Sequence, residues 1–255
     1  MTCLRPPRSD APLALHPVFR VCLVLAFALA LALGAAPDAA KAQPRALVHY
    51  QKNMLYSLSD ADERRLAGDI IARAPDTVSM QEVNRENRGI LELLRADFPS
   101  QKLCRFKDIG GVAVLSRWPV VRGSARCLKG SGVAAMQVDT PGGRVWVMSV
   151  HLETPQKPLH GEMVRALSSE LRRFRGPKIM GGDFNAFPGS ASVTALALGA
   201  GVAPLGPKVV TKRLGGLFSM TIDHVLVTGG DGRVEQLPLI GSDHYGLLAR
   251  FVLDL

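Results

Sequence analysis

Between residues 45 and 253, short apolar runs alternate with segments of helical periodicity, and turn-forming residues separate them. Apolar runs rich in β-branched residues predict strands, and apolar residues spaced three and four apart predict helices. The predicted strands are 45–50, 77–81, 111–116, 120–123, 133–139, 145–151, 178–182, 222–228 and 247–253. The predicted helices are 59–74, 87–96, 159–174 and 190–198.

The order of these elements indicates the fold class. Strands and helices do not alternate strictly, and several short strands follow one another, which favours two packed β-sheets with helices outside. We therefore predict an α/β protein. The segment 199–219 is rich in glycine and is predicted to be irregular, and it carries Lys208, Lys212 and Arg213.

The first 42 residues have the pattern of a secretory signal peptide. Arginines 5, 8 and 20 precede an apolar run at 21–36, and Ala40-Lys41-Ala42 follows as a cleavage pattern. The run is shorter than the roughly 20 residues that span a bilayer. No linker or repeat divides the remaining chain. We predict a signal peptide at 1–42, one domain at 43–255, and a secreted or periplasmic protein, which would be membrane-anchored if the leader is not cleaved.

Charge narrows the choice of partner only a little. The full chain carries a net charge of +9, and removing 1–42 takes away four basic and two acidic side chains, which leaves +7. A basic surface attracts anionic partners such as nucleic acid or acidic lipid headgroups. The same excess also serves ordinary solubility.

The segment 43–255 contains two cysteines, Cys104 and Cys127. An exported protein meets an oxidising compartment, which favours a disulfide between them over two buried free thiols. No C-x-x-C or Cys/His spacing indicates a zinc site.

Acidic, amide and imidazole side chains cluster directly after five of the apolar runs. The clusters are Gln81-Glu82-Val83, Ser149-Val150-His151, Gly182-Asp183-Phe184-Asn185, Ile222-Asp223-His224 and Gly241-Ser242-Asp243-His244. Hydrolysis of a phosphate ester needs a cation, an activated water and donors to the phosphoryl oxygens. Such clusters at several strand ends are typical of a metal-assisted active site of this kind.

The acidic and amide residues supply the groups that this chemistry uses. Glu82 and Asp243 are candidate carboxylate ligands of Mg²⁺, for which Mn²⁺ can substitute. Asp183 is the candidate that orients or deprotonates water, and Asn185 is a candidate donor to a phosphate oxygen. Each has a structural alternative, because Glu82 could be a salt-bridged acid and Asp183 with Asn185 could form an Asx turn.

Two histidines are candidate contacts to the phosphate or to the leaving group, His151 and His244. Asp223 is a candidate orienter of His244, because a catalytic imidazole usually needs a carboxylate to fix its tautomer. His224 points to the opposite side of its strand from Asp223, so only one of the two can face the site, and we favour packing for His224 because the resemblance given next selects Asp223. His151, taken alone, could equally be a core histidine.

Seven motifs occur in an order that resembles the endonuclease/exonuclease/phosphatase superfamily. They are Gln51-Lys52-Asn53, Gln81-Glu82-Val83, Leu115-Ser116-Arg117-Trp118-Pro119, Ser149-Val150-His151-Leu152, Gly182-Asp183-Phe184-Asn185, Ile222-Asp223-His224 and Ser242-Asp243-His244. Each motif alone is weak, but together they cover the chain from about residue 47 to its end. The resemblance implies a DNase I-like four-layer α/β sandwich and a phosphoesterase that uses Mg²⁺.

The resemblance also implies roles for individual residues. The implied catalytic residues are His151, Asp183, Asn185, Asp223 and His244; the implied metal ligands are Glu82, Asp243 and Asn53; and the implied substrate contacts are Asn53, Asn185 and His151. Asn53 could also simply cap a turn. DNase I-like enzymes support the first catalytic histidine with an acid from an earlier strand. Asp108 could serve here, or no residue does.

The predicted function is an exported, divalent-metal-dependent phosphodiesterase that acts on nucleic acid, as a monomer without an obligate protein partner. A sphingomyelinase- or phospholipase C-like enzyme is the alternative. It would need an exposed apolar or aromatic hairpin to enter a membrane, and the sequence indicates none. A non-catalytic binding module would be expected to lack a metal carboxylate or a catalytic imidazole, and none is missing.

Overall fold

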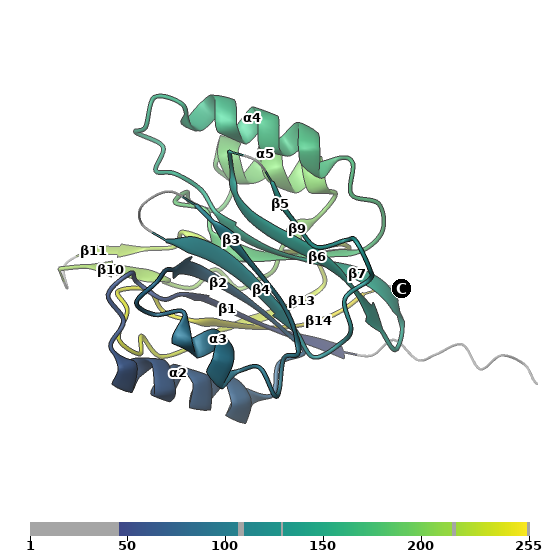
Figure 1. Cartoon of the computed structure of the whole chain (residues 1–255). Coiled ribbons are helices and arrows are strands. Elements are labelled where there is room, and N and C mark those ends of the chain that lie inside the picture. Colours follow the sequence, from purple (N-terminus) through teal and green to yellow (C-terminus); the bar gives the residue numbers. More distant parts are fainter. Residues whose placement is uncertain (1–45, 107–109, 129, 216–217, 254–255) are drawn as a thin grey trace, which may run out of the picture. The chain divides into compact units, whose positions relative to one another are not determined.

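The computed structural model describes residues 46–106, 110–128, 130–215 and 218–253. In this part of the chain, two six-stranded sheets and a two-stranded hairpin occur together with four helices (Figure 1). The predicted signal peptide and Asp108 lie outside the described residues. No described helix is both long enough and apolar enough to span a bilayer.

Each six-stranded sheet is mixed, and most of its strand pairs are antiparallel. The first sheet has the order β13-β14-β1-β2-β4-β3, formed by β1 (Ala46–Asn53), β2 (Thr77–Val83), β3 (Ser100–Arg105), β4 (Gly111–Ser116), β13 (Gly232–Gln236) and β14 (Leu247–Val252). The second has the order β5-β6-β7-β8-β12-β9, formed by β5 (Arg126–Leu128), β6 (Gly132–Thr140), β7 (Gly143–His151), β8 (Lys178–Asp183), β9 (Ala203–Pro204) and β12 (Asp223–Val227). In each sheet one pair is parallel, β1 with β2 and β7 with β8.

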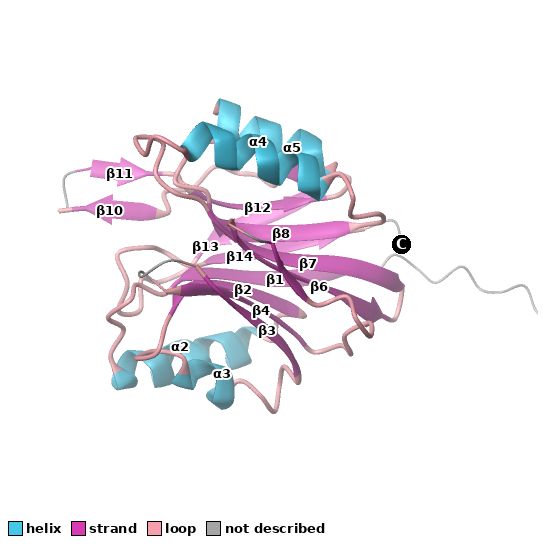
Figure 2. Cartoon of the chain, turned by 45° about the horizontal axis from the view of Figure 1, so that its top comes forward, coloured by secondary structure: helices cyan, strands magenta, loops and turns pink. Residues whose placement is uncertain are grey.

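The helices form two outer layers (Figures 1 and 2). Helices α2 (Asp60–Arg73) and α3 (Gly89–Leu93) lie against the first sheet, and α4 (His160–Leu171) and α5 (Ala191–Ala200) lie against the second. Ser59 and Ser190 cap α2 and α5, because each side chain accepts a hydrogen bond from a backbone N–H of the first turn.

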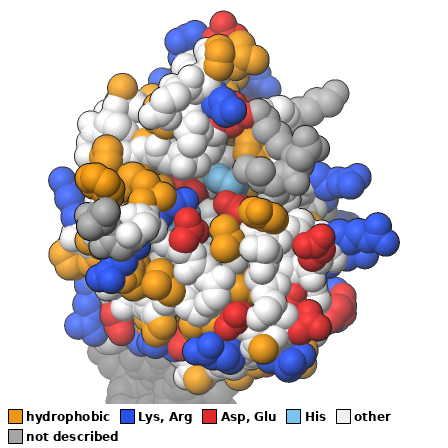
Figure 3. Space-filling model, turned by 90° about the vertical axis from the view of Figure 1, so that its left-hand side faces the viewer, with side chains coloured by type: hydrophobic (Ala, Val, Ile, Leu, Met, Phe, Trp, Pro, Cys, Tyr) orange, Lys and Arg blue, Asp and Glu red, His pale blue; other side chains and the backbone are white. Residues whose placement is uncertain are grey.

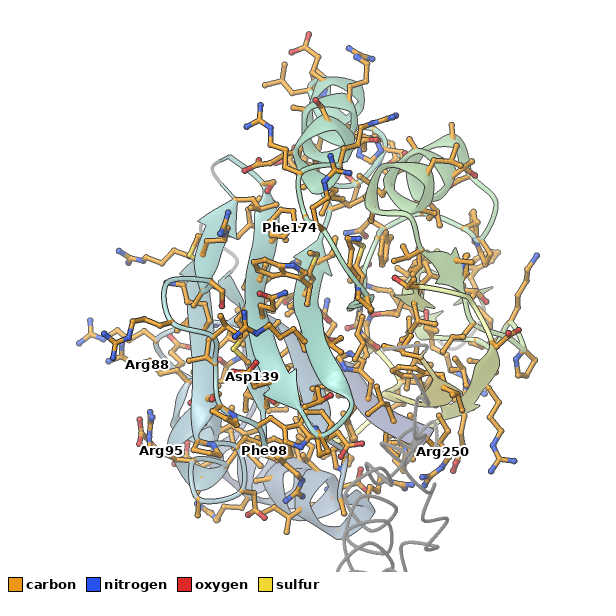
Figure 4. All side chains as sticks on the ribbon, turned by 90° about the vertical axis from the view of Figure 1, so that its right-hand side faces the viewer. Arg88, Arg95, Phe98, Asp139, Phe174 and Arg250 are labelled. Carbon is orange, nitrogen blue, oxygen red and sulfur yellow. A yellow bond between two sulfur atoms is a disulfide. The ribbon has the colours of Figure 1, made fainter. Side chains whose placement is uncertain are left out.

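Apolar side chains fill the three spaces between these four layers. Between the sheets, Val114 of the first packs in one cluster with Met136 and Val225 of the second. Under α4 and α5, the Phe174 ring meets Trp146 edge to face, with ring centres 4.6 Å apart (Figure 4). The predicted four-layer sandwich of two mostly antiparallel sheets is confirmed.

A buried histidine marks a close approach of the two sheets. His49 of β1 is hydrogen-bonded to Thr77 Oγ1 at 2.8 Å and to Ser79 Oγ at 2.9 Å. A Cβ atom on Gly181 of the other sheet would lie 2.4 Å from His49 Nε2, so only glycine fits there. Complete burial lowers the pKa of His49 to about 3, and the imidazole is therefore neutral in the folded protein.

A disulfide joins the two sheets at one edge. It links Cys104 in β3 to Cys127 in β5, with Cα atoms 5.5 Å apart. Both strands are edge strands of their sheets. The predicted disulfide is therefore confirmed.

Several element predictions were wrong at the level of detail. The predicted strand 120–123 contributes a single bridge, between Val120 and Val138. The predicted helix 87–96 is reduced to α3, because Asn84 and Asn87 exchange side-chain-to-backbone hydrogen bonds that hold the preceding residues in a turn. The segment 199–219, predicted to be irregular, forms β9 and a hairpin of β10 (Lys212–Leu214) and β11 (Phe218–Met220).

Candidate active site

Strand pairing brings the polar strand ends together. In the first sheet, Asn53 pairs with Gln81 across the parallel strands β1 and β2, so Glu82 follows directly beside it. In the second, His151 of β7 and Asp223 of β12 both pair with Asp183 of β8. Figure 3 views this end of the molecule, where a histidine lies in a hollow with acidic side chains around it.

Asp183 lies at the centre of the cluster and is buried. Its Oδ2 accepts a hydrogen bond from Asn53 Nδ2 at 3.1 Å and lies 3.7 Å from Nε2 of both His151 and His244. Its Oδ1 accepts from the backbone N–H of Asn185 at 2.8 Å. Burial, together with the nearby charge of Asp223, raises the pKa of Asp183 to about 6. A carboxylate of this basicity can accept a proton near neutral pH.

His244 is held by Asp223. Its Nδ1 donates to Asp223 Oδ2 at 2.8 Å, and Asp223 Oδ1 accepts from Gln51 Nε2 at 3.0 Å. Burial lowers the pKa of His244, but the Asp223 and Asp183 carboxylates outweigh it, so the pKa lies above its ordinary value. The predicted pairing of Asp223 with His244 is present.

His151 differs from His244 in its surroundings. It is buried beside the Phe106 ring, whose centre lies 5.8 Å from that of the imidazole. Burial lowers the pKa of His151 to about 4, so this histidine is neutral at physiological pH. The pKa values of the two histidines that face Asp183 are therefore shifted in opposite directions.

Glu82 is turned towards the site by an irregularity in β2. The register between β2 and β4 shifts at this residue, and its φ of 61° is unusual for a non-glycine residue. Its Oε1 accepts from Asn53 Nδ2 at 3.1 Å and its Oε2 from the backbone N–H of Tyr56 at 3.0 Å. Asn53 therefore connects Glu82 to Asp183.

Asp243 and a lysine that sequence analysis did not place in the site lie next to His244. Lys212 Nζ, from β10, is 3.1 Å from Asp243 Oδ2 and 2.9 Å from His244 Nε2. The other oxygen, Asp243 Oδ1, is buried and accepts no hydrogen bond from the described residues. An orphaned carboxylate oxygen of this kind fits a ligand position for a cation.

Asn185 is present at the site, but its amide is already engaged. Its Nδ2 donates to the carbonyl of Leu152 at 2.7 Å, and its φ of 47° lies in the left-handed region. The expected Asx-type contact with Asp183 is also present. The residue therefore fixes the turn after β8, and its side chain retains one further N–H for a ligand.

Supporting residues connect the two sheets beneath the site. Gln81 Nε2 donates to Ser149 Oγ at 3.0 Å, and Gln51 Nε2 donates to Gln81 Oε1 at 2.8 Å. Lys52 is buried and donates to the carbonyls of His244, at 2.6 Å, and Leu239, which ties the 239–244 loop to β1. Sequence analysis quoted these residues in its motifs without assigning them a role.

Of the four remaining histidines, His16 lies outside the described residues, and the other three are packing residues, as expected for His224. His224 Nε2 donates to the carbonyl of Ala186 at 2.8 Å, on the opposite side of β12 from Asp223. His160 is hydrogen-bonded to Ser192 Oγ at 2.7 Å, away from the site. His49 lies between the sheets.

Comparison with known proteins agrees with this geometry. A sequence model described as the Endonuclease/Exonuclease/phosphatase family matches residues 51–244, which include all eight candidate residues. The chain belongs to this family. Its members are generally phosphoester hydrolases. A search of curated protein sequences found no match.

Solved structures share the fold at low sequence identity. An endonuclease/exonuclease/phosphatase from Beutenbergia cavernae is 23% identical with a TM-score of 0.66, over 82% of this chain and 72% of that one. Sphingomyelinase C from Streptomyces griseocarneus is 19% identical with a TM-score of 0.59, over 81% of this chain and 99% of that one. D. rerio TDP2 complexed with a single-strand DNA product is 17% identical with a TM-score of 0.64, over 81% and 98%.

Among the described residues, one group of two acids and a histidine is compact enough to hold a metal by itself. Asp183, Asp223 and His244 offer ligand atoms within 4.8 Å of one another. However, His244 uses Nδ1 for Asp223 and faces Lys212 with Nε2, and both Asp223 oxygens accept hydrogen bonds. We therefore interpret this group as a hydrogen-bonded catalytic cluster. Glu82, joined to Asp183 through Asn53, and Asp243, next to His244, are the better candidates for metal ligands.

Proposed function

We propose that this protein is an exported, divalent-metal-dependent phosphodiesterase that acts on nucleic acid, as a monomer without an obligate protein partner. The observation that carries the proposal is the buried Asp183 carboxylate, which two imidazoles and the Asn53 amide approach from different strands. Packing alone does not explain why these groups meet at Asp183. Burying Asp183 beside a second acid, Asp223, disfavours the charged form of Asp183.

Each residue of the cluster has a separate role in the proposed reaction. Asp183 accepts a proton from the attacking water, whose oxygen forms a new bond to phosphorus as the bond to the leaving oxygen breaks. His151 and His244 donate hydrogen bonds to phosphoryl oxygens. In its doubly protonated form, His244 keeps Nδ1–H on Asp223 and can pass the Nε2 proton to the leaving oxygen. The Lys212 ammonium, beside His244, adds positive charge where the phosphate binds.

Glu82 and Asp243 are the residues that would hold Mg²⁺ or Mn²⁺. Asn53, expected as a third ligand, turns Nδ2 to Glu82 and Asp183 while its Oδ1 accepts from the backbone N–H of Leu55, so in this arrangement it orients Glu82. The two carboxylates offer oxygen donors, which these hard cations prefer, and they include the orphaned Asp243 Oδ1. When bound, the cation would neutralise negative charge on the phosphoryl group.

One observation favours a phospholipid substrate as the second candidate. Sequence analysis expected no exposed apolar hairpin, and this was wrong, because the β10–β11 hairpin exposes Leu214 and Phe218. The strands are only three residues each, and their apolar residues alternate with Arg213 and Ser219, so helix and strand patterns in the sequence did not reveal them.

An activity panel tests the proposal. The protein is incubated with Mg²⁺ and, separately, plasmid DNA, RNA, sphingomyelin vesicles and bis-p-nitrophenyl phosphate. We expect hydrolysis of the nucleic acids and of the small diester, loss of both with EDTA, and recovery with Mg²⁺ or Mn²⁺. Hydrolysis of sphingomyelin alone would support the second candidate, and activity that survives EDTA would contradict the metal requirement.

A further inference from the structure

A broad groove opens beside Glu82, outside the catalytic cluster. It has a volume of about 930 Å³, and its lining includes Tyr56, Arg85, Glu86, Arg88 and Arg105. These side chains come from the loops after β1 and β2 and from the end of β3. We call it the arginine groove.

The arginine groove carries an excess of positive charge. Arg85, Arg88 and Arg105 are exposed, and among the described residues none has a carboxylate within ion-pair distance. Among the described residues of the lining, Glu86 is the one acidic residue. Three guanidinium groups in one groove without internal partners fit a ligand with several phosphates, since guanidinium binds phosphate in a bidentate manner.

The arginine groove is built onto the loop that holds the candidate metal ligand. The backbone N–H of Tyr56 donates to Glu82 Oε2 at 3.0 Å, and the carbonyl of Tyr56 accepts from Asn84 Nδ2 at 2.7 Å. Tyr56 is 55% exposed, so its ring forms an open aromatic surface at the groove. A phosphate chain bound here would lead directly to the catalytic cluster.

On the other side of the cluster, the β10–β11 hairpin offers a second contact surface. Strand pairing places Leu214 opposite Phe218 and Lys212 opposite Met220, so these four side chains share one face. Lys212 on that face reaches His244 and Asp243. Phe218 on the same face is 70% exposed, so its ring is open to a ligand, and Figure 3 shows hydrophobic side chains beside the hollow.

We propose that a single-stranded nucleic acid lies across the site, with its phosphates in the arginine groove on one side and a base stacked on Phe218 on the other. The inference rests on the proposed function and specifies its substrate. An unpaired strand is required because only an unpaired base offers a free face to a ring. A phospholipid headgroup brings one phosphate to the site, which would leave the three arginines without a ligand.

Binding without turnover tests the inference. Fluorescein-labelled dT10 is titrated with the protein in EDTA, and fluorescence anisotropy gives Kd at several salt concentrations. The Arg85→Gln/Arg105→Gln variant should bind at least tenfold more weakly, with a salt slope that is shallower by roughly 0.7 for each lost phosphate contact. Phe218→Ala should weaken binding about tenfold, whereas Phe218→Tyr, which keeps the ring, should retain the parent Kd.

A matched control lies at the opposite end of the same fold. Arg144, at the start of β7, is exposed and pairs with Asp139, and seven residues of extended strand separate it from His151, about 23 Å. Figure 4 views that end, where Asp139 is labelled. Arg144→Gln should bind dT10 like the parent.

Three outcomes would overturn the inference. They are equal affinity for dT10 and for the dT10·dA10 duplex, a loss in Arg144→Gln as large as in the groove variant, or binding to sphingomyelin vesicles that depends on Phe218 while dT10 does not bind. Hydrolysis of bis-p-nitrophenyl phosphate by the parent protein is measured alongside. If it occurs while dT10 fails to bind, the inference fails, whereas the phosphodiesterase activity of the proposed function stands.

Discussion

The buried catalytic centre and the exposed rim of this site are built in opposite ways. In the centre, formed by Asp183, Asp223 and His244, the side chains are buried and tied to one another or to Gln51 and Asn53. On the rim, the arginine groove and Phe218 are open to solvent. Fixed, desolvated groups stabilise charge as it develops in a reaction, whereas mobile exposed groups contribute graded binding. Changes in the centre should therefore act on turnover, and changes on the rim on affinity.

The sharpest test of this comparison removes the central carboxylate. Asp183→Asn keeps the shape of the side chain but cannot accept the proton of the water, and His244→Ala removes an imidazole from the same cluster. We expect each to lower kcat by about 10² or more, roughly 2.7 kcal/mol, in the hydrolysis of bis-p-nitrophenyl phosphate. Asp139→Asn, an exposed acid at the opposite end of the fold, is the control. Full activity in Asp183→Asn would disprove its assignment.

His49 shows the effect of burial on a pKa without a role in the reaction. His49 is as deeply buried as the centre but lies between the sheets, and folding lowers its pKa from 6.5 to about 3. The unfolded state therefore binds an extra proton between these pH values, and the stability of the folded state falls as pH drops below about 6.5.

From pH 7 to pH 5, His49 alone should lower the free energy of unfolding by about 2 kcal/mol. Urea denaturation of the parent and of His49→Gln at both pH values measures this. The parent should lose about that much more than the variant on going to pH 5. An identical pH dependence in both proteins would show that His49 is not held neutral by burial.

Lys212 lies at the boundary between centre and rim, and its replacement should have the smallest of these effects. Lys212→Met keeps the length of the side chain and removes the charge beside His244. We expect kcat/KM to fall about tenfold, mainly through a higher KM, because the ammonium binds the phosphate in ground and transition states alike. Lys208→Met, on the same segment but exposed outside the cluster, should change neither constant. A pure kcat effect would place Lys212 with the centre instead.

Much of the centre could be predicted from the sequence because its residues lie at the ends of strands. A strand delivers the residue at its end to the edge of the sheet, so an apolar run followed by Glu82, His151 or Asp183 predicts where these side chains go. Asp243 and His244 follow the same logic from the loop before the last strand. The two sheets and the four described outer helices were predictable for similar local reasons. The Cys104–Cys127 pairing was expected because the segment 43–255 holds two cysteines and export favours their oxidation.

The residues of the rim could not be predicted from the sequence, because the rim depends on contacts between segments far apart in the chain. Lys212 reaches His244 only because β10 forms a bridge with that residue, and the segment around it shows no strand-like run. The arginine groove unites residues of three separate loops and strand ends. The backbone of Glu82, with its positive φ, is likewise imposed by the shift in register against β4.

The amino-acid order alone determined which chemical groups this protein possesses and at which strand ends they lie, since hydrophobic periodicity is a local property of the chain. The tertiary structure alone decided which of them meet, as with Asn53 between Glu82 and Asp183, because such contacts follow from the register and packing of two sheets. It also decided which residues surround them, such as Lys212 and Phe218, and we propose that these residues determine which substrate binds.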